Sequence, residues 1–192
     1  MEVITIDFET KGIVGNALVN PPRPCGVAVR FPDEDASSYY PVWDTYPFGP
    51  DYGAGFYVLQ RAWFDYPEVP KVFHNAPFDL SVAAEWLGLK WPRWDLIHDT
   101  MYLVFHNNPY GALDLKGAAE EVLGEPPDER NELRDWIIAN VKCKPSEWGA
   151  YICEAPFEIC EPYANGDVDR TYRLFVHIMQ KMADGELYAE SV

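Results

Sequence analysis

Short apolar runs and alternating apolar and polar positions fill the first forty residues, which is the pattern of β-strands. The predicted strands cover residues 3–8, 25–31 and 37–43. The third is rich in Tyr and Val, which favour extended backbone. Strands that follow one another without an intervening helix pair as antiparallel hairpins. The chain therefore opens with antiparallel strands.

After residue 70 the pattern changes to one short strand followed by helices. The apolar run at 71–74 predicts an inner strand, and apolar residues from Leu80 to Leu87 then repeat at the spacing of one helix face, with Gly88 placed to end the helix. Further helical segments are predicted over 58–64, 115–123, 133–141 and 164–182, and residues 44–55 are predicted to form a loop. This order indicates an α/β fold with a mixed central β-sheet flanked by α-helices.

Length and composition indicate one folded module. The chain has 192 residues, of which 48% are hydrophobic and 15% aromatic. One domain takes about 150 residues, and a chain this apolar can bury a core rather than stay disordered. We therefore expect residues 1–192 to form a single domain. No apolar run approaches the ~20 residues that a membrane-spanning helix needs.

The charge of the chain restricts how it can bind a polyanion. Fifteen Lys and Arg stand against thirty-one Asp and Glu, which gives a formal net charge of −16. Proteins that hold nucleic acid unaided are usually basic, because Lys and Arg neutralise the phosphates. A nucleic-acid ligand would therefore require metal ions or a basic partner.

The cysteines indicate a reducing compartment. They are Cys25, Cys143, Cys153 and Cys160, and no two of them form a CxxC motif. Glu2 and Asp7 interrupt the first apolar run, so we expect no secretory leader. The expectation is a cytoplasmic protein with reduced thiols.

Two pairs of residues carry candidate chemistry. Asp7 and Glu9 alternate along the first strand, so both side chains point to the same side of the sheet. Tyr163 and Asp167 are four residues apart on the last helix and share one of its faces. Composition alone gives roughly one Asp-x-Glu in this chain. Neither pair by itself identifies an active site.

A third feature lies where the strand at 71–74 ends and a helix starts. Here Asp79 falls in the first helical turn and its carboxylate is directed back at the strand ends. Taken alone, Asp79 is equally well explained as an acid favoured by the helix dipole, and Asn75 as a turn residue. Together with the two pairs, it indicates converging carboxylates, which suit hard cations such as Mg²⁺ or Mn²⁺.

Three segments resemble the exonuclease motifs of the DEDD superfamily, in the same order. They are segment 4–10, which ends in IDFET, HNAPFDL at 74–80 and PYANGDVDRT at 162–171. HDTMYL at 98–103 and LDLKGAAEEVLG at 113–124 are similar to further segments of the proofreading domain of family A DNA polymerases, the group of bacterial DNA polymerase I and many phage polymerases. The resemblance covers nearly the whole chain and implies a ribonuclease H-like fold.

The resemblance also implies roles for the acids. Asp7, Glu9 and Asp167 would hold one divalent ion, and Asp7 would bridge to a second ion that Asp79 supports partly through water. Tyr163 lies four positions before Asp167, the last acid of the three motifs, and this spacing resembles the tyrosine (DEDDy) branch of the superfamily. In that branch the tyrosine, together with Glu9 here, orients the attacking water. All five residues are expected to be catalytic.

Candidate substrate contacts follow from the same motifs. They are Thr10, Ile13, Asn75 and Phe78. Ile13 lies four residues beyond Glu9 and is expected to contact the terminal base, and Asn75 is expected to contact the substrate backbone.

The resulting expectation is a metal-dependent 3′-5′ exodeoxyribonuclease that uses two Mg²⁺ or Mn²⁺ ions on a single-stranded or frayed 3′ end of DNA. It would proofread for a family A DNA polymerase, either free-standing or as an N-terminal domain, in a bacterial cell or the cytoplasm of a phage-infected host. One alternative is a 3′-5′ exoribonuclease, since the tyrosine branch includes tRNA-trimming enzymes. The other is a noncatalytic interaction module with the same fold.

Overall fold

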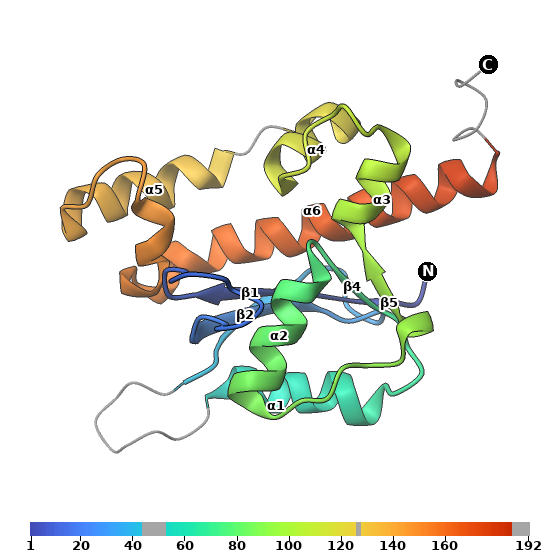
Figure 1. Cartoon of the computed structure of the whole chain (residues 1–192), viewed down its shortest axis with the longest axis horizontal. Coiled ribbons are helices and arrows are strands. Elements are labelled where there is room, and N and C mark those ends of the chain that lie inside the picture. Colours follow the sequence, from blue (N-terminus) through green and yellow to red (C-terminus); the bar gives the residue numbers. More distant parts are fainter. Residues whose placement is uncertain (44–52, 126–127, 186–192) are drawn as a thin grey trace.

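A mixed five-stranded sheet lies at the centre of this computed structural model, which describes residues 1–43, 53–125 and 128–185 (Figure 1). The strands are β1 (Ile4–Thr10), β2 (Pro24–Arg30), β3 (Ser38–Pro41), β4 (Lys71–Phe73) and β5 (Ile97–Asp99). Their order in the sheet is β3-β2-β1-β4-β5. β2 is antiparallel to β1 and β3, whereas β4 is parallel to β1 and β5. The predicted α/β fold with a mixed sheet is confirmed.

Helices cover both faces of the sheet (Figure 1). One face carries α1 (Ala54–Gln60), which continues into the π-helix η1 (Arg61–Asp65), and α2 (Ala76–Leu87). The other face carries α3 (Thr100–Asn107), α4 (Leu115–Leu123), α5 (Asp128–Val141) and α6 (Phe157–Ala183). Leu80 of α2 packs in one apolar cluster with Ile6, whereas Phe175 of α6 packs in another with Val72. The sheet therefore carries separate apolar clusters on its two faces.

Strand β1 divides its side chains between these two layers. Ile4, Ile6 and Phe8 are buried in the core shared with α1 and α2. Because side chains alternate along a strand, Asp7 and Glu9 point to the opposite face, toward α6. The alternation that buries the apolar residues of β1 on one face thus puts two acids side by side on the other face.

The predicted elements are present, with shifted ends. The turns predicted at 58–64 belong to the longer segment α1–η1. α6 begins at Phe157, earlier than the predicted residue 164, and contains Pro162, a residue that usually ends a helix. Strand β5, helix α3 and the short 3₁₀-helix η2 (Trp94–Leu96) were not predicted. Most of the predicted loop at 44–55 lies outside the described residues.

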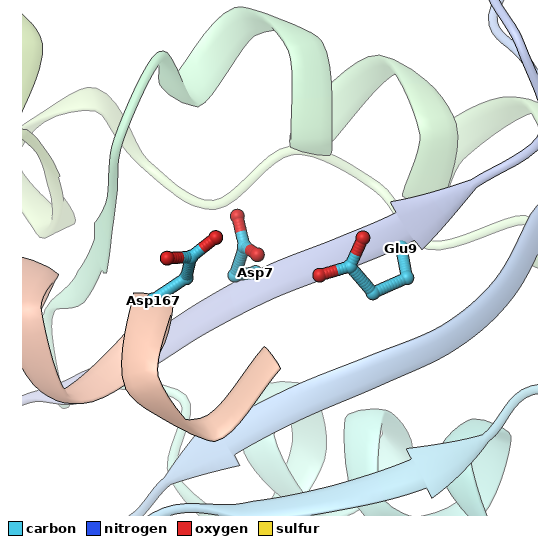
Figure 2. A group of neighbouring side chains, drawn as sticks. All are labelled: Asp7, Glu9 and Asp167. Atoms are coloured by element: carbon cyan, nitrogen blue, oxygen red, sulfur yellow. The ribbon is translucent and has the colours of Figure 1, made fainter. Parts of the chain in front are cut away.

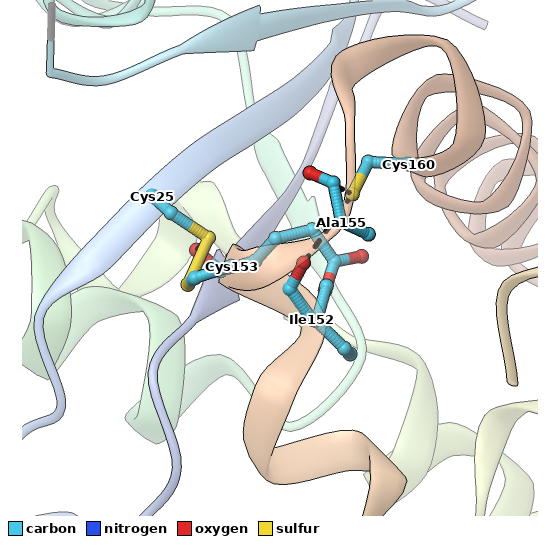
Figure 3. The surroundings of a disulfide bond; sticks show 6 residues. Cys25, Ile152, Cys153, Ala155 and Cys160 are labelled. Atoms are coloured by element: carbon cyan, nitrogen blue, oxygen red, sulfur yellow. Dashed lines mark hydrogen bonds between the residues drawn. A yellow bond between two sulfur atoms is a disulfide. The ribbon is translucent and has the colours of Figure 1, made fainter. Parts of the chain in front are cut away.

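A disulfide bond joins Cys25, in β2, to Cys153 in the 3₁₀-helix η3 (Trp148–Glu154) (Figure 3). The expectation of reduced thiols is therefore wrong for these two cysteines, whereas Cys143 and Cys160 are free. The two bonded residues are 128 positions apart in sequence, but folding brings their Cα atoms to 5.6 Å, which suits a disulfide. Local spacing carries no signal of such a pair.

Among the described helices, none has the length and apolar character to cross a membrane.

Candidate active site

Three acids from two elements converge beside β1 (Figure 2). Asp7 and Glu9 come from the strand, and Asp167 comes from the middle of α6. One carboxylate oxygen of each lies within 4.8 Å of the others. Glu9 and Asp167 are buried and Asp7 is half-buried. The arrangement is that of a small oxygen-lined site for a cation.

The strand next to Glu9 carries a glycine that leaves room for the side chain of Tyr39. Gly26 of β2 stands opposite Glu9 in the antiparallel register. A Cβ atom at Gly26 would lie only 2.0–2.4 Å from the phenol of Tyr39. Glycine at this position therefore lets the Tyr39 phenol lie close to the backbone of β2, near Glu9.

Two of the three acids, Asp7 and Glu9, have pKa values above the ordinary range. Burial raises the pKa of Asp7 to about 6, although the nearby Lys116 acts against this shift. Burial, and then the negative charge of Asp7, raise the pKa of Glu9 to about 8. Oε1 of Glu9 is also buried without a hydrogen-bond partner among the described residues. Carboxylates that lack donors fit a divalent ion such as Mg²⁺ or Mn²⁺, which would replace the lost hydration.

Asp79 approaches the same strand from the other layer. It lies in the first turn of α2, is 1% exposed and accepts a hydrogen bond of 3.1 Å from the backbone N–H of Phe8. Burial, followed by the charge of Asp7, raises the pKa of Asp79 well above its ordinary value. Its oxygens are not part of the three-acid group. The structure thus places Asp79 against the backbone between Asp7 and Glu9 rather than beside Asp167.

The start of α2 is held by Asp99, a residue that the sequence analysis did not single out. Its Oδ1 accepts the backbone N–H of Asn75 at 2.9 Å, and its Oδ2 accepts that of Ala76 at 3.0 Å. Oδ1 also caps α3 by accepting the N–H of Met101 at 3.0 Å. Asn75 has φ of 70°, which the two bonds help to hold. The available signal was an Asp before a helical run in HDTMYL.

Tyr163 and Lys116 complete the surroundings of Asp167. Tyr163 lies one turn before Asp167 on α6, and its ring packs edge-to-face against Trp148 with centroids 6.0 Å apart. Lys116, in the first turn of α4, forms an ion pair with Asp167, and its Nζ lies 4.4 Å from the centre of the Tyr163 ring. Lys116 is 7% exposed. This helix was predicted from the sequence, but Lys116 was not singled out.

The four candidate substrate contacts lie around this end of the sheet. Thr10 ends β1, and Ile13 follows it with 57% of its surface exposed. Asn75 is the residue before α2, and Phe78 in the first turn of α2 is partly buried against the core. Ile13 is thus open to a ligand, whereas Phe78 contributes partly to packing.

Comparison with known protein families identifies a matching family. A family model described as 3′-5′ exonuclease, of the family A DNA polymerase type, matches residues 42–183. The match covers most of the 192 residues and includes Asp79, Tyr163 and Asp167, and it begins after Asp7 and Glu9. A search of curated proteins found no match. The mixed sheet with helices on both faces agrees with the ribonuclease H-like fold that the sequence resemblance implies.

Proposed function

Because the chain belongs to the 3′-5′ exonuclease domain family of family A DNA polymerases, we propose that its 192 residues form one domain that removes nucleotides from 3′ ends of DNA by two-metal-ion hydrolysis. Family membership makes the chain a nuclease that acts on nucleic acid. The observation that carries the finer proposal is the convergence of Asp7, Glu9 and Asp167 within 4.8 Å.

The carboxylates are the groups that would hold the ions. Asp7, Glu9 and Asp167 would hold the first Mg²⁺ or Mn²⁺. Asp7 and Asp79 would support the second, as the resemblance to the exonuclease motifs implies. When bound, the ions lower the pKa of water and neutralise charge on the phosphoryl and leaving oxygens. The orphaned Oε1 of Glu9 supports this role, because a buried carboxylate oxygen without a donor is otherwise costly.

Tyr163 and Glu9 orient the attacking water, as in the tyrosine branch. An ordinary phenol keeps its proton at neutral pH, so Tyr163 acts through a hydrogen bond rather than as a base. Its place on α6, one turn from Asp167 and against Trp148, supports a fixed orientation.

The terminal nucleotide is held by a few local contacts. Ile13 offers apolar surface to the terminal base, and Thr10, Asn75 and Phe78 contact the remainder of the nucleotide. At a net charge of −16, the domain gains little from long-range attraction to DNA. This supports a proofreading role beside a more basic polymerase, which delivers the primer end at high effective concentration.

One assay tests this function. End-labelled single-stranded DNA and RNA of matched sequence are incubated with the protein in Mg²⁺, in Mn²⁺ and in EDTA, and the products are resolved by size. We expect mononucleotides from the 3′ end of DNA, in either metal and not in EDTA. Asp7→Ala with Glu9→Ala is the matched inactive variant, with folding checked by circular dichroism.

Three other results of this assay would contradict the proposal. Preference for RNA would make the protein an exoribonuclease. No release from either polymer would leave a noncatalytic module, and turnover by the double variant at the wild-type rate would remove Asp7 and Glu9 from the mechanism.

A further inference from the structure

Lys116 occupies an unfavourable position for a lysine. It lies in the first turn of α4, where the helix dipole favours acids over bases, and it is 7% exposed. Lysine is seldom buried unless its charge is paired. Neighbouring groups must therefore compensate for the unfavourable helix dipole and for the burial of the charge.

The local backbone aims Lys116 at the acids. Asp114 caps α4 by accepting the backbone N–H of Gly117 at 3.1 Å, which fixes the first turn. A Cβ at Gly117 would lie 2.7 Å from the Cβ of Ala112, so the turn packs tightly against the preceding loop. From this turn the Lys116 side chain reaches across to α6.

The compensation comes from the carboxylates of the site. Lys116 forms an ion pair with Asp167, and its charge also opposes the rise in pKa at Asp7 and Glu9. Arg170, one turn further along α6, reaches Asp167 only at 3.8 Å and belongs to the same helix. Lys116 is thus a cation that a separate element brings into the acid group.

We propose that Lys116 is a replaceable counter-ion: its ammonium neutralises Asp167 and the neighbouring acids when no metal is bound, and divalent ions take over that task when they enter. The inference rests on the proposed metal site. In the metal-free protein the buried acids would otherwise repel one another, and removing one partner of a buried ion pair is strongly destabilising. Once ions neutralise the acids, the site no longer depends on Lys116.

A purely structural lysine would behave differently. Its removal would destabilise the fold by a similar amount with and without metal, because the lost contacts would be the same in both states. The dependence of the stability loss on metal therefore separates the two roles, and it does not require catalytic activity as a readout.

The experiment compares the melting temperatures of the full chain in EDTA and in saturating Mn²⁺. Lys116→Met removes the charge and keeps most of the side-chain volume. Lys90→Met is the matched control, because it removes the same charge from an exposed position. Lys116→Arg keeps the charge at the site.

We expect Lys116→Met to melt well below Lys90→Met in EDTA, and the gap to shrink by about half or more in Mn²⁺. By linkage, the folded Lys116→Met protein then binds Mn²⁺ more tightly than wild type, by about tenfold for one unit charge removed near the ion. Isothermal titration or the electron paramagnetic resonance signal of free Mn²⁺ measures this directly. Lys116→Arg should follow wild type in both conditions.

The outcomes are distinguishable. Lys116→Met that is folded in Mn²⁺ and unfolded in EDTA is the extreme form of the expected result. A gap that persists in Mn²⁺, a variant unfolded in both conditions, or no gap in EDTA would overturn the counter-ion role. If the wild type itself shows no Mn²⁺ binding, the proposed metal site fails instead.

Discussion

At the scale of single residues, Asp7 and Glu9 contribute to how the stability of the metal-free protein depends on pH. Their pKa values, raised to about 6 and about 8, exceed the unfolded values of 3.8 and 4.5. The folded state therefore binds more protons than the unfolded state across this window. Stability is full below the unfolded values and is lost as pH rises through the folded ones.

We predict that in EDTA the melting temperature falls by about 5 °C or more between about pH 5 and pH 8.5. Asp7→Asn with Glu9→Gln should make this profile shallower, because two of the titrating groups are gone and Asp79 remains. Thermal unfolding followed by circular dichroism gives both curves. A wild-type curve as flat as that of the double variant would mean that these acids ionise freely.

Tyr163 gives a second prediction for a single residue. Tyr163→Phe should bind Mn²⁺ normally and retain the ring packing against Trp148, but slow cleavage by about 10- to 10³-fold, the loss expected for one positioned hydrogen bond. Single-turnover kinetics isolates the chemical step. An unchanged rate would assign Tyr163 a packing role only.

The sequence pointed to the acids but not to Lys116. Strand alternation puts Asp7 and Glu9 on one side of the sheet, and helical spacing puts Asp167 on the same face as Tyr163. Only the resemblance to the exonuclease motifs singled these pairs out from chance. Lys116 reaches Asp167 from a different element, 51 positions away in sequence, so no local period reports the contact. Asp99 was missed for the same reason, because its acceptors serve a helix that begins more than twenty residues earlier.

At the scale of elements, Asp99 joins the start of α2 to β5 and α3. Asp99→Ala leaves the N–H groups of Asn75 and Ala76 without their acceptor and removes the cap of α3. Because Asp79 lies in the first turn of α2, the change also loosens the support of that acid. The effect should therefore reach both stability and activity.

We predict that Asp99→Ala lowers the free energy of unfolding by about 1–3 kcal/mol and lowers kcat more than it raises KM. Asp95→Ala is the matched control, since the Asp95 side chain is 67% exposed and pairs with Arg93 on the surface. Urea unfolding and steady-state kinetics measure the two effects. Equal behaviour of the two variants would show that Asp99 does not position α2.

Elements with a strong period were predictable, and short ones were not. α2 and α4 show clear helical spacing and end at Gly88 and Gly124, both of which adopt positive φ. β5 has only three residues, and all of them are half-buried. A strand this short shows no recognisable alternation of apolar and polar residues. The start of α6 was missed because Pro162 interrupts the pattern there, although the helix continues through it.

At the scale of the whole molecule, the Cys25–Cys153 bond ties β2 to η3, the segment that precedes α6. Closing a loop of 128 residues restricts the unfolded chain. We predict that Cys153→Ser, or reduction of the wild type, lowers the free energy of unfolding by about 2–4 kcal/mol.

Cys143→Ser is the matched control, because Cys143 is a free cysteine. Urea unfolding with and without reductant gives the stabilities, and thiol titration of the denatured protein counts the bonded cysteines. Four reactive thiols in protein that has never been reduced would show that the bond does not form.

The net charge of −16 sets how the whole domain meets its substrate. DNA carries one negative charge per phosphate, so long-range repulsion slows encounter and counterion release contributes little to affinity. In the proposed mechanism, binding would then depend on contacts at the site, where metal ions would neutralise the four acids and the terminal bases would stack or pack locally.

We therefore predict that the 192-residue protein binds single-stranded DNA only in the micromolar range or more weakly, with a shallow dependence on salt. Fluorescence anisotropy of a labelled oligonucleotide, in Ca²⁺ to suppress cleavage, measures affinity across a salt series. Asp7→Asn, which removes one carboxylate of the site, should weaken DNA binding in Ca²⁺. It should not change how the affinity depends on salt, because no phosphate-neutralising lysine or arginine is lost. Nanomolar affinity at physiological salt with a steep slope would mean that the chain holds DNA through a basic surface of its own, and a polymerase partner would then not be needed for capture.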